Sequence, residues 1–317
     1  MERRSNMCRS TGMSVTNRVG VEDANWLLSL AELPHLEKMA PLAGGWDNTN
    51  FLLHLSDGSK VVLKAWFANR VEEVHRVILR HIHLDSHGIP TTVPIKLYDD
   101  RSFAEKNGVA WTLLPYIQGG HLGKDSESLV SLGKELARMH EIPVSECFPR
   151  EYRMGFTLFD KVASLSKDGG PDLSFVRLLA SEYSSIKSNL PEDIPIGVLH
   201  GDLFPDNIIG KGGVRAILDL EEAWIGPKIF DLVMAFVGFG WEGTEPKFER
   251  WESLVEGYQS IRILGDEEIE ALPTMHRYAT LAIACWRYWK HNLADPNEEL
   301  SKRYVEMVDR LEVKFDF

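Results

Sequence analysis

The spacing of apolar residues changes along the chain, and this change separates a strand-rich N-terminal part from a helical C-terminal part. Within 50–55, apolar and polar residues alternate, as expected for a half-buried β-strand. Asp57-Gly58 then predicts a tight hairpin turn into a second strand at 60–66. Further strands are expected just before residue 44, at 93–98 and at 109–116, with helices at 21–33 and 70–86. The pattern predicts a small antiparallel sheet with one inserted helix.

Beyond residue 118, apolar residues mostly recur every three to four positions, which is the spacing of amphipathic helices. Pro273 falls inside the longest of these stretches and is expected to split it. The expected helices are 128–139, 173–190, 246–261, 267–293 and 297–314. The exception to this helical pattern is the segment 198–231, which begins with short apolar strands.

Within that segment, two short apolar runs at 208–209 and 216–218 are separated by the sequence GKGG, which predicts a tight turn. Asp202 and Asn207 precede the first run, and Asp219 follows the second. A hairpin built in this way places all three side chains at its open end.

An Asp, an Asn five residues later and a second Asp after the next strand suit phosphoryl transfer. Asp202 can accept the proton of an attacking hydroxyl group. Asn207 and Asp219 can hold Mg²⁺ on nucleotide phosphates, because Mg²⁺ takes few protein oxygens and keeps several waters. The alternative is a turn-rich hairpin in which these side chains only satisfy backbone groups. The sequence H-x-D at His200 could also begin a metal-hydrolase site, but no further histidine follows within about forty residues.

Two segments carry a family resemblance, HGDLFPDN at 200–207 and ILDLEEAWIGPKIFDL at 217–232. They are similar to the superfamily of aminoglycoside phosphotransferases, choline kinases and homoserine kinases, and GDLFPDN is closest to homoserine kinase-like members. The resemblance extends over roughly residues 38–295. It implies an α+β, protein-kinase-like fold of two lobes that uses ATP and Mg²⁺ to phosphorylate a small molecule. Many relatives have Asp-Phe where this chain has Asp219-Leu220, and leucine can fill the same apolar position.

The resemblance also implies a nucleotide site in the N-terminal part. The glycine-rich turn between the first two strands contains Gly44, Gly45 and Asn48, and in kinases such a turn lies over the nucleotide phosphates. Lys64, on the third strand, would contact the α- and β-phosphates. The alternative is that the turn is an ordinary hairpin and that Lys64 is a solvated residue at the edge of the sheet.

The remaining nucleotide contacts fall on the following helix and on a hinge. The carboxylate partner of the strand lysine is expected to be Glu73, although periodicity does not separate it from Glu72. The hinge between the lobes is expected at Leu114, Tyr116 and Ile117, whose backbone groups would hydrogen-bond adenine.

Two more residues of the resembling segments are expected to have structural roles. His200 would hold the catalytic loop by hydrogen bonding. Asp231 follows Pro227 and could cap the helix that begins there. The resemblance favours another role for Asp231, in which it braces the catalytic loop.

The identity of the acceptor depends on weaker signals. Glu221 and Glu222 follow Asp219 within three residues, and at least one of them is expected to face the acceptor and hold an ammonium group. A late helix carries an aromatic cluster, Trp286, Tyr288 and Trp289, which could form a cage for a quaternary ammonium. Arg287 on the same helix could bind a carboxylate. Homoserine or a similar small amino alcohol is the favoured acceptor. Choline or ethanolamine and aminoglycosides are alternatives, and aromatic residues at this spacing are also typical of a helical core.

Two other classes of function can be compared with this prediction. A kinase-fold binding module that had lost catalysis would usually lack Lys64, Asp202, Asn207 or Asp219, and all four are present. A protein kinase is disfavoured by the compact HGD loop and by the absence of an APE-like segment after Asp219.

Composition narrows the expected partners. The 35 basic and 47 acidic residues give a formal net charge of −12, which disfavours a nucleic-acid binder. No apolar run in the sequence reaches membrane-spanning length. Cys8, Cys147 and Cys285 lie far apart and have neither disulfide-framework nor zinc spacing, which suits a reducing cytoplasm. We therefore expect a cytoplasmic protein that binds a small molecule, and neither nucleic acid nor membrane.

The expected organisation has three parts. Residues 1–20 are polar, lack the apolar region of a secretory signal, and are expected to be a disordered extension. Met7 or Met13 could be the true start in place of Met1, and the arginines there leave a transit peptide as an alternative. Residues 21–117 are expected to form the N-lobe with the nucleotide-binding sheet, and 118–317 the C-lobe with the catalytic loop, metal site and acceptor site.

Overall fold

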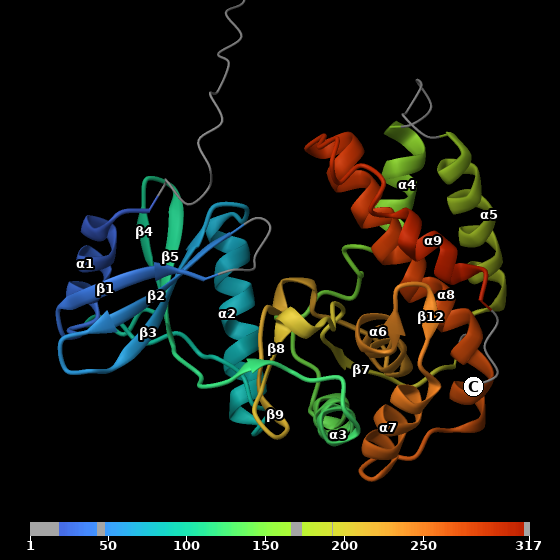
Figure 1. Cartoon of the computed structure of the whole chain (residues 1–317), viewed down its shortest axis with the longest axis horizontal. Coiled ribbons are helices and arrows are strands. Elements are labelled where there is room, and N and C mark those ends of the chain that lie inside the picture. The colour runs from blue at the N-terminus through green and yellow to red at the C-terminus, as the bar shows by residue number, and fades with distance from the viewer. Residues whose placement is uncertain (1–18, 43–47, 166–172, 192, 314–317) are drawn as a thin grey trace, which may run out of the picture. The chain divides into compact units, whose positions relative to one another are not determined.

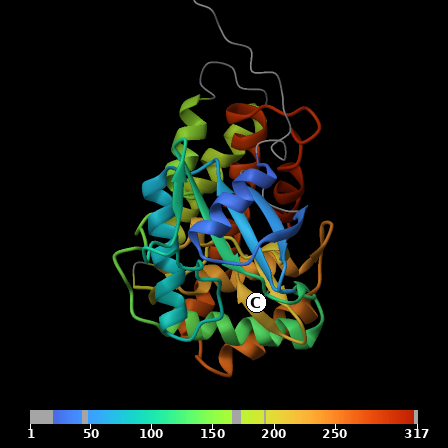
Figure 2. The same cartoon turned by 90° about the vertical axis from the view of Figure 1, so that its left-hand side faces the viewer.

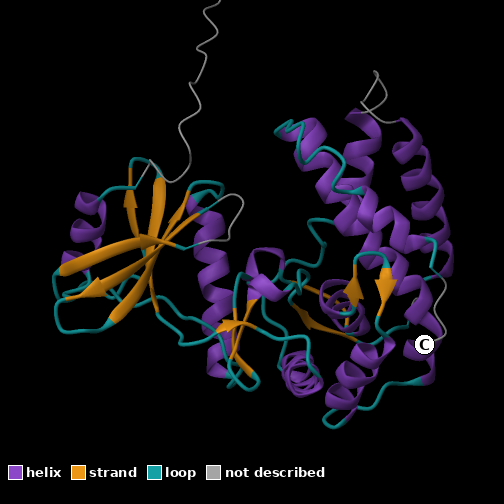
Figure 3. Ribbon diagram, viewed as in Figure 1, coloured by secondary structure: helices purple, strands orange, loops and turns teal. Residues whose placement is uncertain are grey.

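The computed structural model describes residues 19–42, 48–165, 173–191 and 193–313, and has the α+β architecture that the sequence predicts (Figure 1). The chain forms an N-terminal unit, Met1–Ile78 with Val93–Tyr116, and a C-terminal unit, Leu79–Thr92 with Ile117–Phe317. Strands dominate the first unit and helices the second (Figure 3). The chain passes from the first unit to the second between Tyr116 and Ile117, and the segment 79–92 also belongs to the C-terminal unit.

The sheet of the N-terminal unit has five antiparallel strands in the order β1-β2-β3-β5-β4. The strands are β1 (Leu36–Pro41), β2 (Thr49–Leu55), β3 (Lys60–Trp66), β4 (Ala104–Lys106) and β5 (Val109–Pro115). Along β2, buried residues alternate with partly exposed ones, so the alternation in the sequence follows the two faces of the sheet. In β3, Lys64 lies between Asn50 of β2 and Thr112 of β5.

The strand expected at 93–98 does not form. Ile95 N–H donates to the Leu113 carbonyl at 2.7 Å, but Tyr98 N–H donates to the Leu30 carbonyl at 2.8 Å. The segment therefore changes partner within a few residues and does not follow one strand. Its place at the edge of the sheet is taken by β4, which pairs with β5.

Two helices accompany this sheet. Helix α1 (Val21–Leu30) lies across one face, as Figure 2 shows, and buries Ala24, Leu27 and Leu28 in the core cluster with the strands. Side chains alternate along β3, so Lys64 points to the face opposite Leu63 and Ala65, which belong to this cluster. Helix α2 (Val71–Ser86) begins in the N-terminal unit and ends in the C-terminal unit.

The C-terminal unit is mainly helical. Its helices are α3 (Ser126–Glu141), α4 (Phe156–Leu165), α5 (Leu173–Asn189), α6 (Ile229–Phe239), α7 (Phe248–Gln259), α8 (Asp266–Tyr288) and α9 (Val305–Leu311). Helix α6 lies in the core, and its residues are buried along its whole length except at Gly238. A Cβ atom at Gly238 would lie 2.2 Å from the Leu203 carbonyl oxygen, so glycine is what permits the loop before β8 to approach this helix.

The central hairpin forms as predicted. Strands β8 (Ile208–Gly210) and β9 (Val214–Ile217) pair antiparallel, and β6 (Gly120–His121) adds to β8. Strand β7 (Ile196–Leu199) pairs instead with β10 (Trp224–Pro227). It is followed by residues 200–207, the segment that the sequence predicts as the catalytic loop. A short ribbon of β11 (Trp241–Glu242) and β12 (Glu245–Pro246) completes the strands.

Three expectations for the helices need correction. Pro273 does not split α8, which is continuous. The proline removes the bond to the Ile269 carbonyl, but both residues lie on the exposed side, where water can solvate that oxygen. Helix α4 was missed, and the closing helix is shorter than expected, because turns occupy 298–304. Within the described ranges, no helix is long and apolar enough to span a membrane.

Candidate active site

The loop between β7 and β8 carries Asp202 and Asn207, and hydrogen bonds join them. Asn207 Nδ2 donates to the Asp202 carbonyl at 2.7 Å and to Asp202 Oδ2 at 3.0 Å. Pro205 begins the 3₁₀ turn η2 (Pro205–Asn207), which brings the two side chains together. Since the Asn207 nitrogen makes both bonds, its Oδ1 oxygen lies on the other side of the amide.

The end of β9 is tied to the same loop. Leu218 N–H donates to the Asn207 carbonyl at 2.8 Å. His200 accepts a bond from Asp202 N–H on Nδ1 at 3.1 Å, so its proton is on Nε2, which donates to the Leu218 carbonyl at 2.7 Å. Asp219 follows with φ of 56°, in the left-handed region that few non-glycine residues adopt. The three residues that the sequence predicted together thus lie at one end of the hairpin.

Asp231, near the start of α6, holds the inner side of this loop. Its Oδ2 accepts from His200 N–H at 2.5 Å and its Oδ1 from Gly201 N–H at 2.9 Å. The carboxylate is completely buried, and it lies in the first turn of the helix, where the macrodipole favours negative charge. These contacts are the ones that a bracing role requires.

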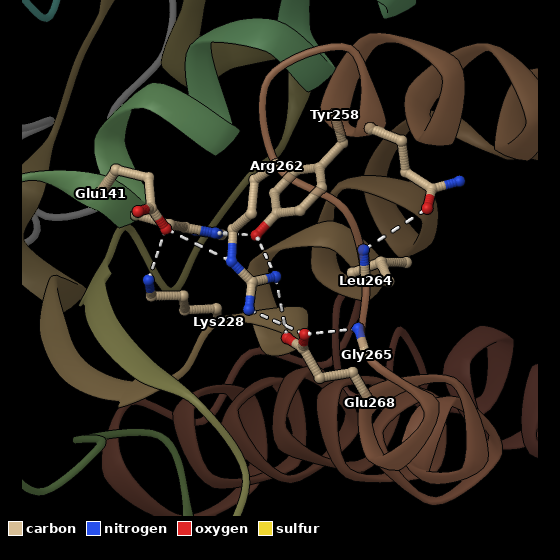
Figure 4. A network of polar contacts seen from close by, with 9 residues as sticks. Glu141, Lys228, Tyr258, Arg262, Leu264, Gly265 and Glu268 are labelled. Atoms are coloured by element: carbon tan, nitrogen blue, oxygen red, sulfur yellow. Dashed lines mark hydrogen bonds and ion pairs between the residues drawn. The ribbon is translucent and has the colours of Figure 1, made fainter.

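A chain of buried polar groups continues from Asp231 toward α7 and α8. His140 Nε2 lies 3.5 Å from Asp231 Oδ2, and His140 Nδ1 lies 2.8 Å from the Tyr258 hydroxyl. Burial lowers the pKa of His140, so the ring is neutral and its Nε2–H points at the carboxylate. Arg262 Nη1 lies 3.4 Å from the Tyr258 hydroxyl and 3.0 Å from Glu268 Oε1 (Figure 4).

Figure 4 shows how this chain ends in an ion-pair network. Glu141 Oε1 lies 3.3 Å from Arg262 Nε and 2.6 Å from Lys228 Nζ. Glu268, which is completely buried, also accepts from Gly265 N–H at 3.1 Å at the start of α8. Side chains from α3, α7 and α8 therefore support His140, the one side chain of this network that faces the Asp231 carboxylate.

Arg80 of α2 holds the segment that follows Asp219. Its Nη1 donates to the Leu220 carbonyl at 2.7 Å and to the Glu221 carbonyl at 3.1 Å. These carbonyls belong to the 3₁₀ turn η3 (Leu220–Glu222). Since Arg80 is buried, its charge replaces the water that would otherwise solvate the oxygens.

Glu222, the last residue of η3, forms an ion pair with Arg153 on the outer side of the catalytic loop. Arg153 Nε donates to Glu222 Oε2 at 2.9 Å, and Nη2 donates to Oε1. Arg153 lies in the loop before α4, next to Tyr152, whose hydroxyl donates to the Gly201 carbonyl at 2.6 Å. This loop, which no sequence pattern indicated, therefore borders the predicted site.

Burial and the neighbouring carboxylates together set the protonation of Asp202. Burial, followed by the negative charges of Glu222, Asp219 and Asp206, raises the pKa of Asp202 to about 8, while the bond from Asn207 acts in the opposite direction. Positive charge brought to the site, by a cation or a substrate ammonium, would favour the ionised form. The arrangement suits a carboxylate that accepts a proton next to bound cations.

The donor set fits the Mg²⁺ that the fold family implies. Asn207 Oδ1 is not the atom bonded to Asp202, and Asp219 supplies a carboxylate at the same end of the hairpin. In the described part of the chain, no three His, Cys, Asp or Glu residues gather as a metal site. A cation here would thus take most of its oxygens from phosphates and water, as Mg²⁺ commonly does.

Comparison with known proteins identifies this arrangement. A sequence profile described as the phosphotransferase enzyme family matches residues 38–264. The chain belongs to this family. The homoserine kinase of Rhizobium rhizogenes (strain K84 / ATCC BAA-868) is 27% identical to this phosphotransferase over 278 residues, or 85% of each chain.

Two solved structures share the fold of the phosphotransferase. Amicoumacin kinase hAmiN, in complex with AMP-PNP, Ca²⁺ and Ami, has a TM-score of 0.70 at 14% identity over 92% of both chains. The microcompartment-associated aminopropanol kinase has a TM-score of 0.67 at 15% identity, over 92% of this chain and 95% of the other. The predicted fold and the predicted class, a small-molecule kinase with an alcohol group as acceptor, are confirmed at the level of the family.

In the N-terminal unit, the predicted nucleotide residues have these positions. Lys64 is buried, with its ammonium 3.8 Å from the centroid of a Trp66 ring. Asn48 Oδ1 accepts from Ala68 N–H at 3.2 Å. Glu73 Oε2 accepts from Arg70 N–H at 3.0 Å at the start of α2, and its pairing with Lys64 stays a prediction.

Two glycines of the expected phosphate turn, Gly44 and Gly45, lie outside the described residues. The expected hinge is described. Leu114 pairs with Val62 at the end of β5, and Tyr116 and Ile117 follow where the chain passes from one unit to the other. Contact of these hinge residues with adenine stays a prediction.

The two residues expected on the late helix are less accessible than the sequence suggested. Arg287 Nη1 donates to Glu306 Oε2 at 2.9 Å and to the Arg303 carbonyl at 3.2 Å, and only 10% of its side chain is exposed. Burial lowers the pKa of Arg287, while Glu306 and the more distant Asp202 oppose this effect. The Arg287 charge thus interacts with Asp202 at a distance, but its hydrogen bonds are made to α9 and to the turn before that helix.

The neighbouring aromatic residues pack against different partners. Trp286 is partly buried, with its ring centroid 6.2 Å from that of His291. Tyr288 is fully buried and packs on Phe175 at 4.7 Å between ring centroids. This arrangement favours the core interpretation of the aromatic cluster over a cage for a quaternary ammonium.

Proposed function

We propose that this phosphotransferase transfers the γ-phosphoryl group of ATP to the hydroxyl of a small amino alcohol, and that homoserine is the acceptor. The name of the relative from Rhizobium rhizogenes supports homoserine, and that of the aminopropanol kinase supports an amino alcohol. The observation that carries the proposal is the junction of Asp202 and Asn207, held by Asp231 on one side and by the end of β9 on the other.

The proposed reaction uses Asp202 as the proton acceptor. As the acceptor oxygen bonds to the γ-phosphorus, the bond from that phosphorus to the β,γ-bridging oxygen breaks and ADP leaves. The hydroxyl proton passes to the Asp202 carboxylate and from there to solvent. The bonds from Asn207 hold that carboxylate in one orientation, so the base is pre-positioned when the acceptor binds.

Asn207 and Asp219 would hold Mg²⁺, which neutralises phosphate charge when it is bound. Lys64 would contact the α- and β-phosphates, with Glu73 as its carboxylate partner. Glu221 and Glu222 would lie on the acceptor side, because they follow Asp219 within three residues.

The test is steady-state transfer from ATP to homoserine, ethanolamine, choline and an aminoglycoside, by the wild type and Asp202→Asn. We expect the highest kcat/KM with homoserine, and in Asp202→Asn a kcat lower by roughly 10²–10⁴ with nearly unchanged ATP affinity. Asp206→Asn is the matched control, since this exposed carboxylate lies in the same loop, and it should retain most activity.

Near-wild-type turnover of Asp202→Asn would remove Asp202 from the role of base. A higher kcat/KM with choline or with an aminoglycoside would replace homoserine as the acceptor. An absence of transfer to all four alcohols would overturn the proposed function.

A further inference from the structure

The loop 149–155 has a fixed backbone beside the catalytic loop. Tyr152 donates its hydroxyl to the Gly201 carbonyl at 2.6 Å, and Ile225 N–H donates to the Pro149 carbonyl at 2.8 Å. Tyr152 also stacks on Trp224, with ring centroids 5.2 Å apart. The backbone of this loop is therefore held in a defined position next to the loop that carries Asp202.

Arg153 lies on this loop, and its side chain is far more exposed to solvent than that of its ion-pair partner, Glu222. The Glu222 side chain is 9% exposed and the Arg153 side chain is 59% exposed. In another forked pair of the C-terminal unit, Arg262 with Glu268, the arginine is only 13% exposed. The Glu222 carboxylate is thus built into the protein, while the guanidinium that covers it faces solvent.

Glu222 is next to the residue that performs the proposed chemistry. A Cβ atom at Gly201 would lie 2.7 Å from the Glu222 carbonyl oxygen, so the two backbones touch. Gly201 adopts φ of 83°, which suits glycine, and Asp202 follows it directly. Among the neighbouring carboxylates, Glu222 has the largest effect on the pKa of Asp202, consistent with this proximity.

We propose that Arg153 and Glu222 together recognise the zwitterionic head of an amino-acid acceptor, with Glu222 binding its ammonium and Arg153 its carboxylate. This inference rests on the proposed function and makes it more specific. The planar guanidinium fork matches a carboxylate, and a carboxylate is the natural partner of an ammonium group. The free protein keeps the two charges satisfied by pairing them with each other.

The pair also selects between acceptors. An amino-acid acceptor brings one charge for each partner, so every charge stays compensated when the ion pair opens. An amino alcohol without a carboxylate can bind Glu222 only by displacing the Arg153 guanidinium into solvent, and it offers that guanidinium no hydrogen bond in return. Arg153 is better placed for this role than Arg287, which is 10% exposed and bound to Glu306.

A matched pair of acceptors isolates the carboxylate. 3-Amino-1-propanol is homoserine without its carboxylate, and it keeps the hydroxyl, the ammonium and the chain between them. We expect wild-type kcat/KM to be roughly 10- to 100-fold higher for homoserine than for 3-amino-1-propanol, because only homoserine makes charged hydrogen bonds with Arg153. In Arg153→Met this preference should fall to a few-fold, mainly through loss of activity with homoserine.

Three further variants control this result. Arg150→Met removes an equal charge from an exposed position in the same loop and should keep the wild-type preference. Arg153→Lys keeps the charge without the fork and should lose part of the preference. Arg153→Met combined with Glu222→Gln avoids a buried unpaired carboxylate, so it remains informative if the single variant does not fold.

Equilibrium binding of both acceptors, measured by calorimetry, separates this inference from the proposed function. Transfer to homoserine with equal losses for both acceptors in Arg153→Met would overturn the recognition pair and leave the kinase function standing. Homoserine binding that depends on Arg153, without phosphoryl transfer, would support the pair and overturn the function. Neither transfer nor Arg153-dependent binding would overturn both.

Discussion

Two carboxylates flank the catalytic loop, and the protein treats them differently. Asp231, on the inner side, is completely buried and accepts the backbone N–H groups of His200 and Gly201. Glu222, on the outer side, is satisfied by Arg153, whose side chain is 59% exposed. The Asp231 carboxylate is bound by backbone groups whose position is fixed by the fold. The Glu222 carboxylate is bound by a solvent-exposed side chain that can rotate away.

This difference separates the holding of the loop from the selection of a ligand. Backbone donors and the neutral His140 fix Asp231, and Tyr258 and Arg262 extend the support, so a change there disturbs the position of the base. A change at Glu222 leaves these bonds in place and alters the charge that an acceptor meets. We therefore expect inner variants to affect stability and kcat, and outer variants to affect the KM for the acceptor.

The largest effect is expected from Asp231→Ala. This change leaves two buried backbone donors unsatisfied, and each costs about 1–3 kcal/mol of unfolding free energy. Urea unfolding of the variant beside Asp160→Ala, an exposed carboxylate on α4, measures the difference. A loss no larger than that of the control would mean that Asp231 does not hold the loop.

A smaller effect is expected on acidification. Burial lowers the pKa of His140, and it lowers the pKa of His276 to about 3, so both rings stay neutral in the folded chain. In the unfolded chain a histidine takes up a proton below about pH 6.5, so stability falls as the pH drops through that value. At pH 5 the loss amounts to about 2 kcal/mol for His276, whose pKa in the folded chain lies well below that pH.

The measurement is the unfolding free energy at pH 7 and at pH 5, compared between the wild type and variants, because the raised pKa of Asp202, about 8, stabilises the folded chain on acidification over the same interval and opposes the histidines. His276→Gln should reduce this dependence, whereas His35→Gln, at an exposed position of the N-terminal unit, should leave it unchanged. A pH dependence of His276→Gln equal to that of the wild type would contradict the buried neutral state of His276.

The two sides of the loop also differ in how far the sequence predicts them. Asp202, Asn207 and Asp219 are brought together by a local hairpin, so their spacing and the intervening turn were sufficient to group them. Arg153 is 69 positions from Glu222, and His140 is 91 positions from Asp231. No local spacing relates such pairs, and neither Arg153 nor His140 could be selected from the sequence.

Errors in the predicted elements have the same origin. The segment 93–98 has the composition of a strand, but the strand actually at that edge of the sheet is β4, whose three residues were too few to give a signal. Arg287 was expected to bind a carboxylate on chemical grounds, and it does bind one, that of Glu306. Local chemistry indicated what the side chain can bind, while the fold determined which partner it meets.

The most direct test of this division compares Asp231→Asn with Glu222→Gln in steady-state kinetics with ATP and homoserine. We predict that Asp231→Asn lowers kcat by roughly 10²-fold through misplacement of the loop, with little change in the KM for homoserine. Glu222→Gln should raise the KM for homoserine roughly tenfold through loss of a charged hydrogen-bond partner, with the KM for ATP unchanged. If both variants change the same parameter to the same extent, the separation of loop positioning from acceptor recognition is wrong.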